Sequence, residues 1–160
     1  MNLILRDIIL PALAILPPPM TSIRAQVMLL AIGAQESGLK HRRQLGGGPA
    51  RGLWQFERAG IQGVLHHHAT MEHAAAVCWR CGNAGTTAAV YHQLESDDIL
   101  ACAFARLLLW TLPGALPGRD QADEGWRQYI AAWRPGKPHR ERWDANFERA
   151  WDAVIGTVGA

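Results

Sequence analysis

The sequence predicts a single, mainly helical domain, and three observations support this fold class. Apolar residues recur at a spacing near 3.6 along most of the chain. The alternation of apolar and polar residues that is typical of strands is nearly absent, and clusters of glycine and proline divide the chain into segments of helical length. With 160 residues, 49% of them hydrophobic and 19% charged, the chain has the size and composition of one globular domain over residues 1–160.

The first twenty residues are predicted to form an apolar helix over residues 3–16, followed by a proline-rich hinge. Pro11 lies inside this helix and is expected to kink it. Arg6 follows apolar residues and no small-residue cleavage site closes the stretch, so we do not expect a signal peptide. The stretch is also too short to span a bilayer. It either packs on the domain or docks to a partner.

The clearest element is a second helix that begins after Thr21 or Ser22 and ends at Ser37. A hydroxyl side chain is typical of a helix N-cap, and Gly38 readily adopts the left-handed conformation that follows a helix. The next residues, 40–51, are rich in glycine, arginine and proline and are expected to form an irregular loop or a small hairpin. Prolines and glycines mark a turn at 113–118, and further helices are predicted over residues 57–66, 70–78, 84–95, 97–111, 122–133 and 139–155.

Glu36 continues an apolar line at the C-terminal end of the second helix. Burial there and the negative end of the helix dipole both disfavour a carboxylate, so both raise the pKa of this carboxyl group toward neutrality. A carboxyl group with such a pKa is suited to act as the general acid of glycosidic cleavage. From its position on the helix alone, Glu36 is better explained as a solvated residue of the last turn, and the downstream sequence is what favours a catalytic role.

A second polar residue of interest is flanked by aromatic side chains. Trp54 and Phe56 offer rings on which the apolar faces of sugars can lie, and Gln55 between them offers an amide for sugar hydroxyls. This mixture is typical of a sugar-binding site. Ordinary core packing is the alternative explanation for Trp54 and Phe56.

Four segments, in this order, resemble signatures of lytic transglycosylases and goose-type lysozymes. Residues 35–39 (Gln-Glu-Ser-Gly-Leu) and 50–55 (Ala-Arg-Gly-Leu-Trp-Gln) are similar to the Glu-Ser and Gly-Leu-Met-Gln motifs of that family, with Trp54 in place of Met. Residues 98–104 (Asp-Ile-Leu-Ala-Cys-Ala-Phe) resemble its Asn-Ile-x-x-Gly-x-x-Tyr helix, and residues 132–138 resemble its Ala-Tyr-Asn-Ala-Gly-Pro turn. The first two motifs are specific and the last two are degenerate.

The resemblance implies an α+β, lysozyme-like fold with the loop region beside the active-site cleft. It also implies cleavage of peptidoglycan between N-acetylmuramic acid and N-acetylglucosamine, with Glu36 as catalytic acid and base. Trp133 stands in place of an aromatic residue that borders the catalytic carboxyl group, and Tyr129, one helical turn earlier, is placed to supply the hydroxyl that an indole lacks. The predicted substrate-binding residues are Ser37, Gly52, Trp54, Gln55, Phe56, Tyr129 and Trp133.

One catalytic carboxyl group is sufficient under this resemblance, because the N-acetyl group of the substrate stabilises the cationic centre. Glu57 is the nearest second candidate, but the helix dipole favours the explanation that it is simply a charged residue at the start of the next helix. Attack by the sugar's own hydroxyl gives a 1,6-anhydro product, whereas attack by water gives hydrolysis. We expect a lytic transglycosylase that needs no cofactor or metal, and a hydrolytic lysozyme on the same site is the alternative.

Two other classes of function stay open. Cys78 and Cys81 form a Cys-x-x-Cys pair that, with Cys102 and nearby histidines, would suit a zinc site. A matched second pair is missing, and buried thiols explain these cysteines as well. The other class is an inactive glycan-binding or virion structural module on the same scaffold. The net charge of +2 and the short arginine pairs do not indicate a nucleic-acid partner.

A wall-degrading enzyme without an export signal is expected to be carried by a particle or released through a pore. The string Gly-Pro-Ala-Arg-Gly-Leu-Trp-Gln-Phe at residues 48–56 is similar to wall-degrading proteins of tailed bacteriophages. We therefore expect peptidoglycan strands and phage particle proteins as partners. The expected location is the virion, or the host cytoplasm before release, with action at the bacterial cell wall.

Overall fold

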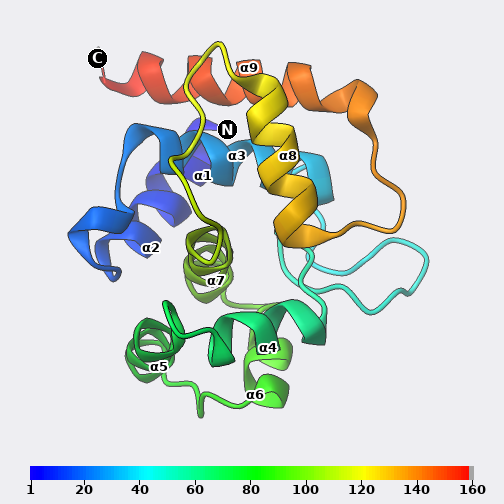
Figure 1. The fold of residues 1–160 in the computed structure, drawn as a ribbon. Helices are drawn as coiled ribbons and strands as arrows, with labels where there is room; N and C mark the ends of the chain where they lie inside the picture. The colour runs from blue at the N-terminus through cyan, green and yellow to red at the C-terminus, as the bar shows by residue number, and fades with distance from the viewer. Residues whose placement is uncertain (159–160) are drawn as a thin grey trace.

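A computed structural model of the chain describes residues 1–158, which are mainly helical, as the sequence predicts. The central helix is α7 (Asp98–Trp110), which is buried from Leu100 to Leu109. Apart from α3 and the N-terminal helices, which are described below, the helices around it are α4 (Arg58–His66), α5 (Met71–Arg80), α6 (Thr87–Gln93), α8 (Ala122–Trp133) and α9 (Arg140–Val158). In Figure 1, α8 and α9 lie above α7, and α4, α5 and α6 lie below it.

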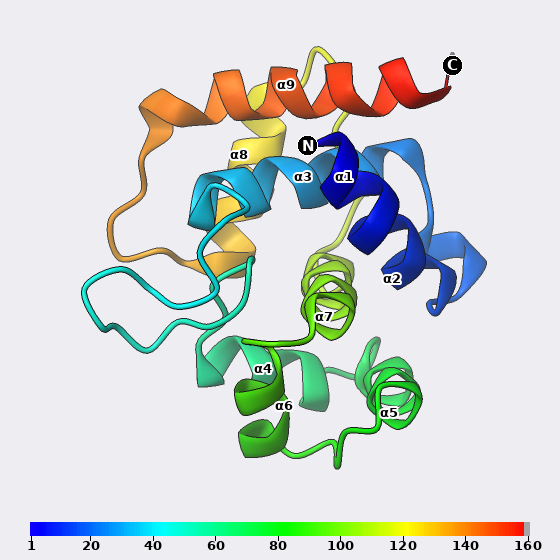
Figure 2. The same ribbon diagram turned by 180° about the vertical axis from the view of Figure 1, so that it is seen from behind.

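The second predicted helix is α3 (Ile23–Ser37), and its bounds agree with the prediction. The Ser22 hydroxyl accepts a hydrogen bond from the Ala25 N–H at 3.0 Å, which satisfies one of the free donors at the helix start. Gly38 ends the helix at φ +64°, where its N–H donates to the Ala34 carbonyl. Because α3 lies alongside α9 (Figure 2), its last turn is held in a defined place.

The N-terminal helix continues from Asn2 to Ala14, but one of its turns is wider than an α-helix. It consists of α1 (Asn2–Ile4), a π-helical turn (Leu5–Ile9) and α2 (Leu10–Ala14). Pro11 has no N–H to donate, and directly before it the Leu10 N–H donates to the Leu5 carbonyl, five residues back. The irregularity predicted at Pro11 is thus a π-helical turn ahead of the proline.

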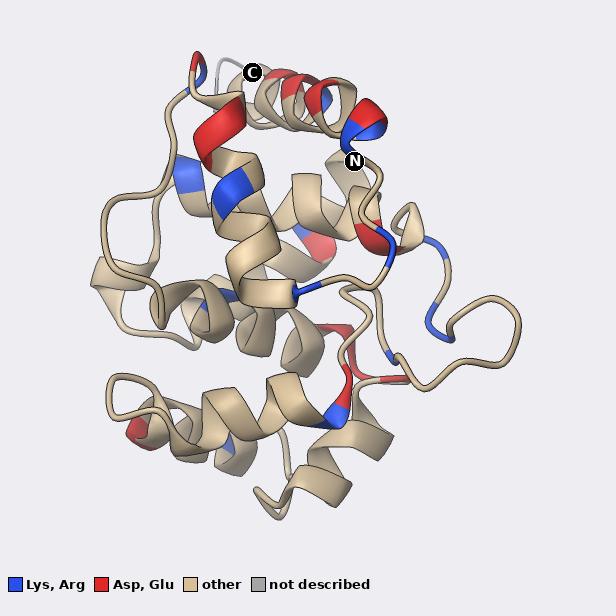
Figure 3. Ribbon diagram, turned by 45° about the vertical axis from the view of Figure 1, so that its right-hand side comes forward, with Lys and Arg blue, Asp and Glu red and all other residues tan. Residues whose placement is uncertain are grey.

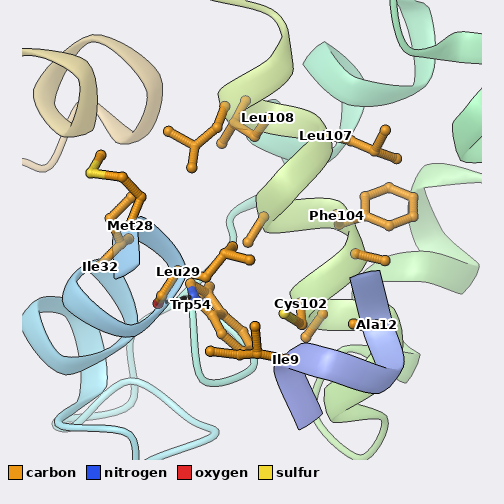
Figure 4. Packing of buried hydrophobic residues seen from close by; sticks show 14 of the residues in the cluster. Ile9, Ala12, Met28, Leu29, Ile32, Trp54, Cys102, Phe104, Leu107 and Leu108 are labelled. Carbon is orange, nitrogen blue, oxygen red and sulfur yellow. Dashed lines mark hydrogen bonds between the residues drawn. The ribbon is translucent and has the colours of Figure 1, made fainter. Parts of the chain in front are cut away.

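This N-terminal helix packs on the domain. Its buried residues, Ile9 among them, lie against α7 (Figure 4). A 3₁₀ turn, Pro18–Met20, follows, and the carbonyl of Met20 accepts a hydrogen bond from Nε of Arg106 at 2.7 Å. The Met20 side chain is buried as well. The proline-rich segment predicted as a hinge is thus in contact with the core at Met20.

The remaining helices form where the sequence predicts them, and one is shorter than expected. The helix predicted over 84–95 is α6, which starts only at Thr87 because Gly85 has φ +72° and the Thr86 hydroxyl caps the helix by accepting from the Ala89 N–H. The last helix begins one residue later than predicted, at Arg140. Within residues 1–158, no helix is long and apolar enough to cross a membrane.

The loop between α3 and α4 is irregular with hairpin-like pairing. In the described chain, its β pairing consists of two isolated bridges, Arg43 with Arg51 and Arg51 with Phe56. An ion pair holds the loop on the start of α7, because Nε of Arg42 donates to the Asp98 carboxylate at 2.8 Å. This loop therefore has a defined position at one end of α3, although it forms no strand.

Candidate active site

A pocket of about 1680 Å³ opens at the C-terminal end of α3, and we call it the Glu36 pocket. Its wall is formed by the last turn of α3, residues 38–45, the start of α4, the end of α8 and the connection from α8 to α9. Segments far apart in the sequence thus meet here. The predicted site residues on this wall are Glu36, Ser37, Gln55, Phe56, Tyr129 and Trp133.

Glu36 and Tyr129 form the polar centre of this pocket. The Tyr129 hydroxyl donates a hydrogen bond to Oε1 of Glu36 at 2.5 Å. Burial raises the pKa of Glu36 to about 7; the hydrogen bond from Tyr129 opposes this shift, and the negative charge of Glu57 adds to it. Near neutral pH this carboxyl group can therefore both give and take a proton.

Tyr129 is held in place by an aromatic stack. Its ring lies parallel to that of Trp143, with the ring centroids 5.4 Å apart. Phe147 in turn stacks on Trp143, with the ring centroids 5.8 Å apart. Burial and the nearby Glu36 carboxylate raise the pKa of Tyr129 well above its ordinary value, so its hydroxyl stays protonated. Tyr129 is therefore a fixed hydrogen-bond donor toward Glu36.

A buried polar network fastens the end of α3 to α9. The Gln35 side chain donates to the His139 carbonyl at 2.9 Å and accepts from the Asn146 amide at 2.8 Å. Arg149 in turn donates to Oδ1 of Asn146 at 2.5 Å. Nothing in the sequence pairs Gln35 with Asn146, because the two residues are far apart in the chain and Asn146 lies in no motif. The network positions the residue next to them, Glu36.

Ser37 was predicted to position substrate, but its hydroxyl is engaged within the protein. The hydroxyl donates to the Leu53 carbonyl at 2.6 Å, lies 3.2 Å from the Gly33 carbonyl and accepts from the Leu39 N–H at 3.2 Å. The Ser37 side chain thus joins the end of α3 to the loop that carries Gln55. Ser37 lines the pocket, and its hydrogen bonds hold this part of the wall in place.

Gly52 is likewise a structural residue and does not line the pocket. Its φ is +76°, and a Cβ at this position would lie 2.7 Å from the Leu94 carbonyl oxygen and 3.4 Å from Cβ of Ala101. Its N–H donates to the Arg42 carbonyl at 2.8 Å. Glycine is required here because φ is positive and the loop passes close to the Leu94 carbonyl at the end of α6, so the structure gives Gly52 a packing role.

Trp54 was predicted to bind sugar, and the structure places it in the core. Its side chain is 0% exposed and lies among residues of α3, the N-terminal helix and α7 (Figure 4). The indole N–H donates to the Leu29 carbonyl at 2.9 Å. A ring without exposed surface cannot contact a sugar, so core packing, the alternative considered for this residue, describes Trp54.

Besides Tyr129, two of the predicted aromatic residues line the pocket, Phe56 and Trp133. Their ring centroids are 5.9 Å apart, and the Trp133 indole N–H donates to the Trp54 carbonyl at 2.8 Å. Phe56 is nearly buried, whereas Trp133 is half-buried and offers ring surface to the pocket. Trp133 is thus the aromatic platform of this site.

Backbone strain is concentrated on the wall of the Glu36 pocket. Within residues 1–158, the residues other than glycine that have positive φ are Leu39, Gln55 and Arg134, at +56°, +49° and +48°. All three line this pocket. Such conformations are costly for residues with a Cβ and are typical of functional sites. At Gln55 the amide nitrogen donates to the Gly52 carbonyl at 2.9 Å, which leaves the amide oxygen as an acceptor for a ligand.

The cysteines lie away from this pocket. Burial raises the pKa of the Cys78 thiol to about 11 and raises the pKa values of Cys81 and Cys102 as well. Within residues 1–158, no three or more His, Cys, Asp or Glu side chains are grouped so that they would hold a metal ion. None of the three cysteines lines the Glu36 pocket.

The chain matches no family model, no curated protein and no solved structure. Its function is therefore inferred from the site itself. The arrangement that has to be explained is one buried carboxyl group with a pKa near neutrality, beside a fixed phenol and an aromatic platform, in a pocket large enough for several sugar rings.

Proposed function

We propose that this protein cleaves the glycan strands of peptidoglycan between N-acetylmuramic acid and N-acetylglucosamine, as a lytic transglycosylase. The observation that carries the proposal is Glu36, whose carboxyl group has a pKa of about 7 and accepts a hydrogen bond from Tyr129 in an open pocket. The resemblance of residues 35–39 and 50–55 to lytic transglycosylase motifs supports the choice of substrate. The proposal includes a lysozyme-like fold in which the Glu36 pocket is the substrate cleft.

The proposed reaction needs one carboxyl group, which returns to its starting state. Glu36 donates its proton to the oxygen of the glycosidic bond as the bond from C1 to that oxygen breaks. The carbonyl oxygen of the substrate's N-acetyl group then bonds to C1 and stabilises the cationic centre. The C6 hydroxyl next attacks C1 and displaces that oxygen, and Glu36 takes up the hydroxyl proton. The products are a 1,6-anhydro sugar and a free hydroxyl on the leaving sugar.

Tyr129 supports both halves of this cycle. Its hydrogen bond stabilises the Glu36 carboxylate after the first proton transfer, and it keeps the carboxyl group in one orientation before that transfer. The indole of Trp133 provides a surface for a sugar ring, and the amide oxygen of Gln55 provides an acceptor for a sugar hydroxyl. These residues are the proposed binding contacts near the reacting bond.

Hydrolysis on the same site is the second candidate, and Glu57 is the observation that favours it. Glu57 is an exposed residue at the start of α4, and it lines the same pocket as Glu36. A carboxylate at this place would act as the base that activates water in an inverting hydrolase. Transglycosylation is the preferred proposal because it accounts for the site with Glu36 alone.

The proposed setting is a tailed phage or prophage, with the enzyme carried in the virion or held in the host cytoplasm until release. This part of the proposal depends on the similarity of residues 48–56 to wall-degrading proteins of tailed phages. Its test is the detection of the protein in purified particles by mass spectrometry. A particle preparation without the protein would limit the proposal to an enzyme released at lysis.

The catalytic proposal is tested by the variant Glu36→Gln. A glutamine side chain keeps the shape and can still accept the Tyr129 hydrogen bond, but it cannot transfer a proton. We expect the folded variant to bind purified peptidoglycan as the natural protein does, while clearing of a peptidoglycan suspension stops. Binding without clearing by both proteins would identify an inactive glycan-binding module instead. An unchanged rate of clearing in the variant would contradict the role of Glu36.

A further inference from the structure

The wall of the Glu36 pocket is strongly basic, although the whole chain is nearly neutral. Six of the 16 Lys and Arg residues of the chain line this pocket, against two of its 14 Asp and Glu residues. The cations lie on the loop after α3, on the connection between α8 and α9, and on α9 (Figure 3). A pocket for neutral sugars alone does not require this concentration of positive charge.

Three of these cations, which we call the basic wall, line the pocket on the connection from α8 to α9 and on the first turn of α9: Arg134, Lys137 and Arg142. All three side chains are exposed, and within residues 1–158 none of them has a carboxylate within ion-pairing distance. Arg142 lies close enough to the polar centre that its charge acts on the Tyr129 hydroxyl. The basic wall therefore shares the pocket with Glu36, and no ion pair within the described chain neutralises its charge.

Local energetics oppose two of these three positions. Arg134 follows α8 in the left-handed conformation, at φ +48°, where glycine is the favoured residue. Arg142 lies in the first turn of α9, where the helix dipole disfavours a positive charge. The cost at Arg134 is one of backbone conformation, and the cost at Arg142 is one of charge. Together with the absence of ion pairs to the basic wall in the described chain, they make this wall a candidate site for an anionic ligand.

We propose that the basic wall binds the carboxylates of the stem peptides of peptidoglycan, so that the enzyme prefers glycan strands that carry peptides with free carboxylates. This inference rests on the proposed function. In intact peptidoglycan the lactyl group of N-acetylmuramic acid is joined to the peptide by an amide bond, so the glycan backbone is uncharged and the negative charges are on the peptides. A cationic wall beside the scissile bond would meet those peptides where they leave the strand.

The test compares two substrates that differ only in charge. Soluble glycan fragments with stem peptides are first N-acetylated at their free amines, and half of the sample then has its carboxyl groups converted to methylamides. We expect the natural enzyme to cleave the carboxylate form with a kcat/KM about tenfold higher at low ionic strength, the combined effect of about three exposed ion pairs. The preference should shrink as salt is added.

The matched variants are the triple substitution Arg134→Ala, Lys137→Ala and Arg142→Ala, and the control Arg127→Ala. Arg127 is an exposed arginine of α8 that pairs with Glu124 outside this pocket. The triple variant should lose the preference for the carboxylate substrate, so that the ratio of the two kcat/KM values falls to about one. Arg127→Ala should keep the ratio of the natural enzyme. Thermal unfolding checks that both variants are folded.

Each outcome has a defined meaning. Equal cleavage of both substrates by the natural enzyme would overturn the basic wall as a peptide site and leave the proposed function intact. No cleavage of either substrate would refute the proposed function, and the inference would fall with it. Binding of DNA in preference to the carboxylate fragments, lost in the triple variant, would assign the basic wall to nucleic acid and overturn the inference.

Discussion

Two pockets share α8, and they differ in whether the arginines at the start of α9 are paired with carboxylates. The Glu36 pocket uses the C-terminal half of α8, and a second pocket of about 760 Å³ uses its N-terminal half. We call the latter the Arg24 pocket; it lies between α8, the turn at 113–116 and the start of α9. Arg140 in this pocket is paired with both Asp123 and Asp144, at 2.5 and 2.6 Å. Arg142, two residues along α9, faces the other pocket without an ion pair in the described chain.

The difference shows where this protein has charged groups without ion pairs and a carboxyl group with a raised pKa. In the Arg24 pocket, Arg127 and Arg140 are paired with carboxylates on the surface, where each such pair contributes little to stability. In the Glu36 pocket, a carboxyl group has a raised pKa and three residues adopt strained backbone conformations. Arg43 on its wall is paired with Glu95, but the three cations of the basic wall have no ion pair in the described chain. Perturbed pKa values and strained backbone that gather at one place are typical of a functional site.

The largest expected effect comes from removing one carboxyl group in each pocket. Glu36→Gln should lower kcat/KM for peptidoglycan by roughly 10²–10⁴-fold, because the proton donor and acceptor is lost. Glu124→Gln, in the Arg24 pocket, should leave the rate within about twofold, because it removes only an exposed ion pair. The release of soluble muropeptides measures both. Similar losses in the two variants would erase the functional difference between the pockets.

The next effect in size concerns the phenol. Tyr129→Phe keeps the stack on Trp143 but removes the hydrogen bond to Glu36, which should lower kcat by about 10–100-fold. Because that bond lowers the pKa of Glu36, the variant should lose activity at a higher pH than the natural enzyme does. The measurement is the pH dependence of kcat/KM. A profile that keeps its natural midpoint would show that Tyr129 does not act on Glu36.

Stability should depend on pH through the same group. The folded protein binds the Glu36 proton more tightly than the unfolded chain does, since the pKa rises from 4.5 to about 7 on folding. Stability relative to Glu36→Gln should therefore be highest below pH 4.5 and decline until the pH passes 7, by up to about 3 kcal/mol. Urea unfolding of both proteins at pH 5 and pH 8 measures this difference. If the two proteins differed in stability by the same amount at both pH values, the raised pKa of Glu36 in the folded protein would be contradicted.

Glu57→Gln should have the smallest effect. The negative charge of Glu57 raises the pKa of Glu36, so its removal should lower that pKa. The variant should therefore lose activity at a slightly lower pH and otherwise keep kcat/KM within about threefold. The same variant separates the two candidate reactions. A loss of roughly 10²-fold or more, with reducing-end products from the natural enzyme, would favour a hydrolase in which Glu57 activates water.

Local patterns were sufficient for the helices and for the pairing of Glu36 with Tyr129. Caps at Ser22 and Gly38 depend on neighbouring residues, and so their positions can be predicted from the sequence. The prediction for Tyr129 combined the resemblance, which put Trp133 beside the carboxyl group, with the spacing of one helical turn, and the Tyr129 hydroxyl does reach Glu36.

What the sequence could not show depends on contacts between distant segments. An aromatic residue in a sugar-like motif has the same local signature whether it is exposed or buried, and only the packing of α3 against α7 decides that Trp54 is buried. The basic wall was missed for the same reason. Its cations become notable only when Arg142 and Arg140 are compared in space, because one is paired and the other is not.

The most direct test of the account is mass analysis of the products formed from purified peptidoglycan by the natural enzyme and by Glu36→Gln. The account predicts 1,6-anhydro-muropeptides from the natural enzyme, lighter by one water than the reducing products of hydrolysis, and none from the variant. Muropeptides released in equal yield by both proteins, or no cleavage at all by the folded natural protein, would contradict it.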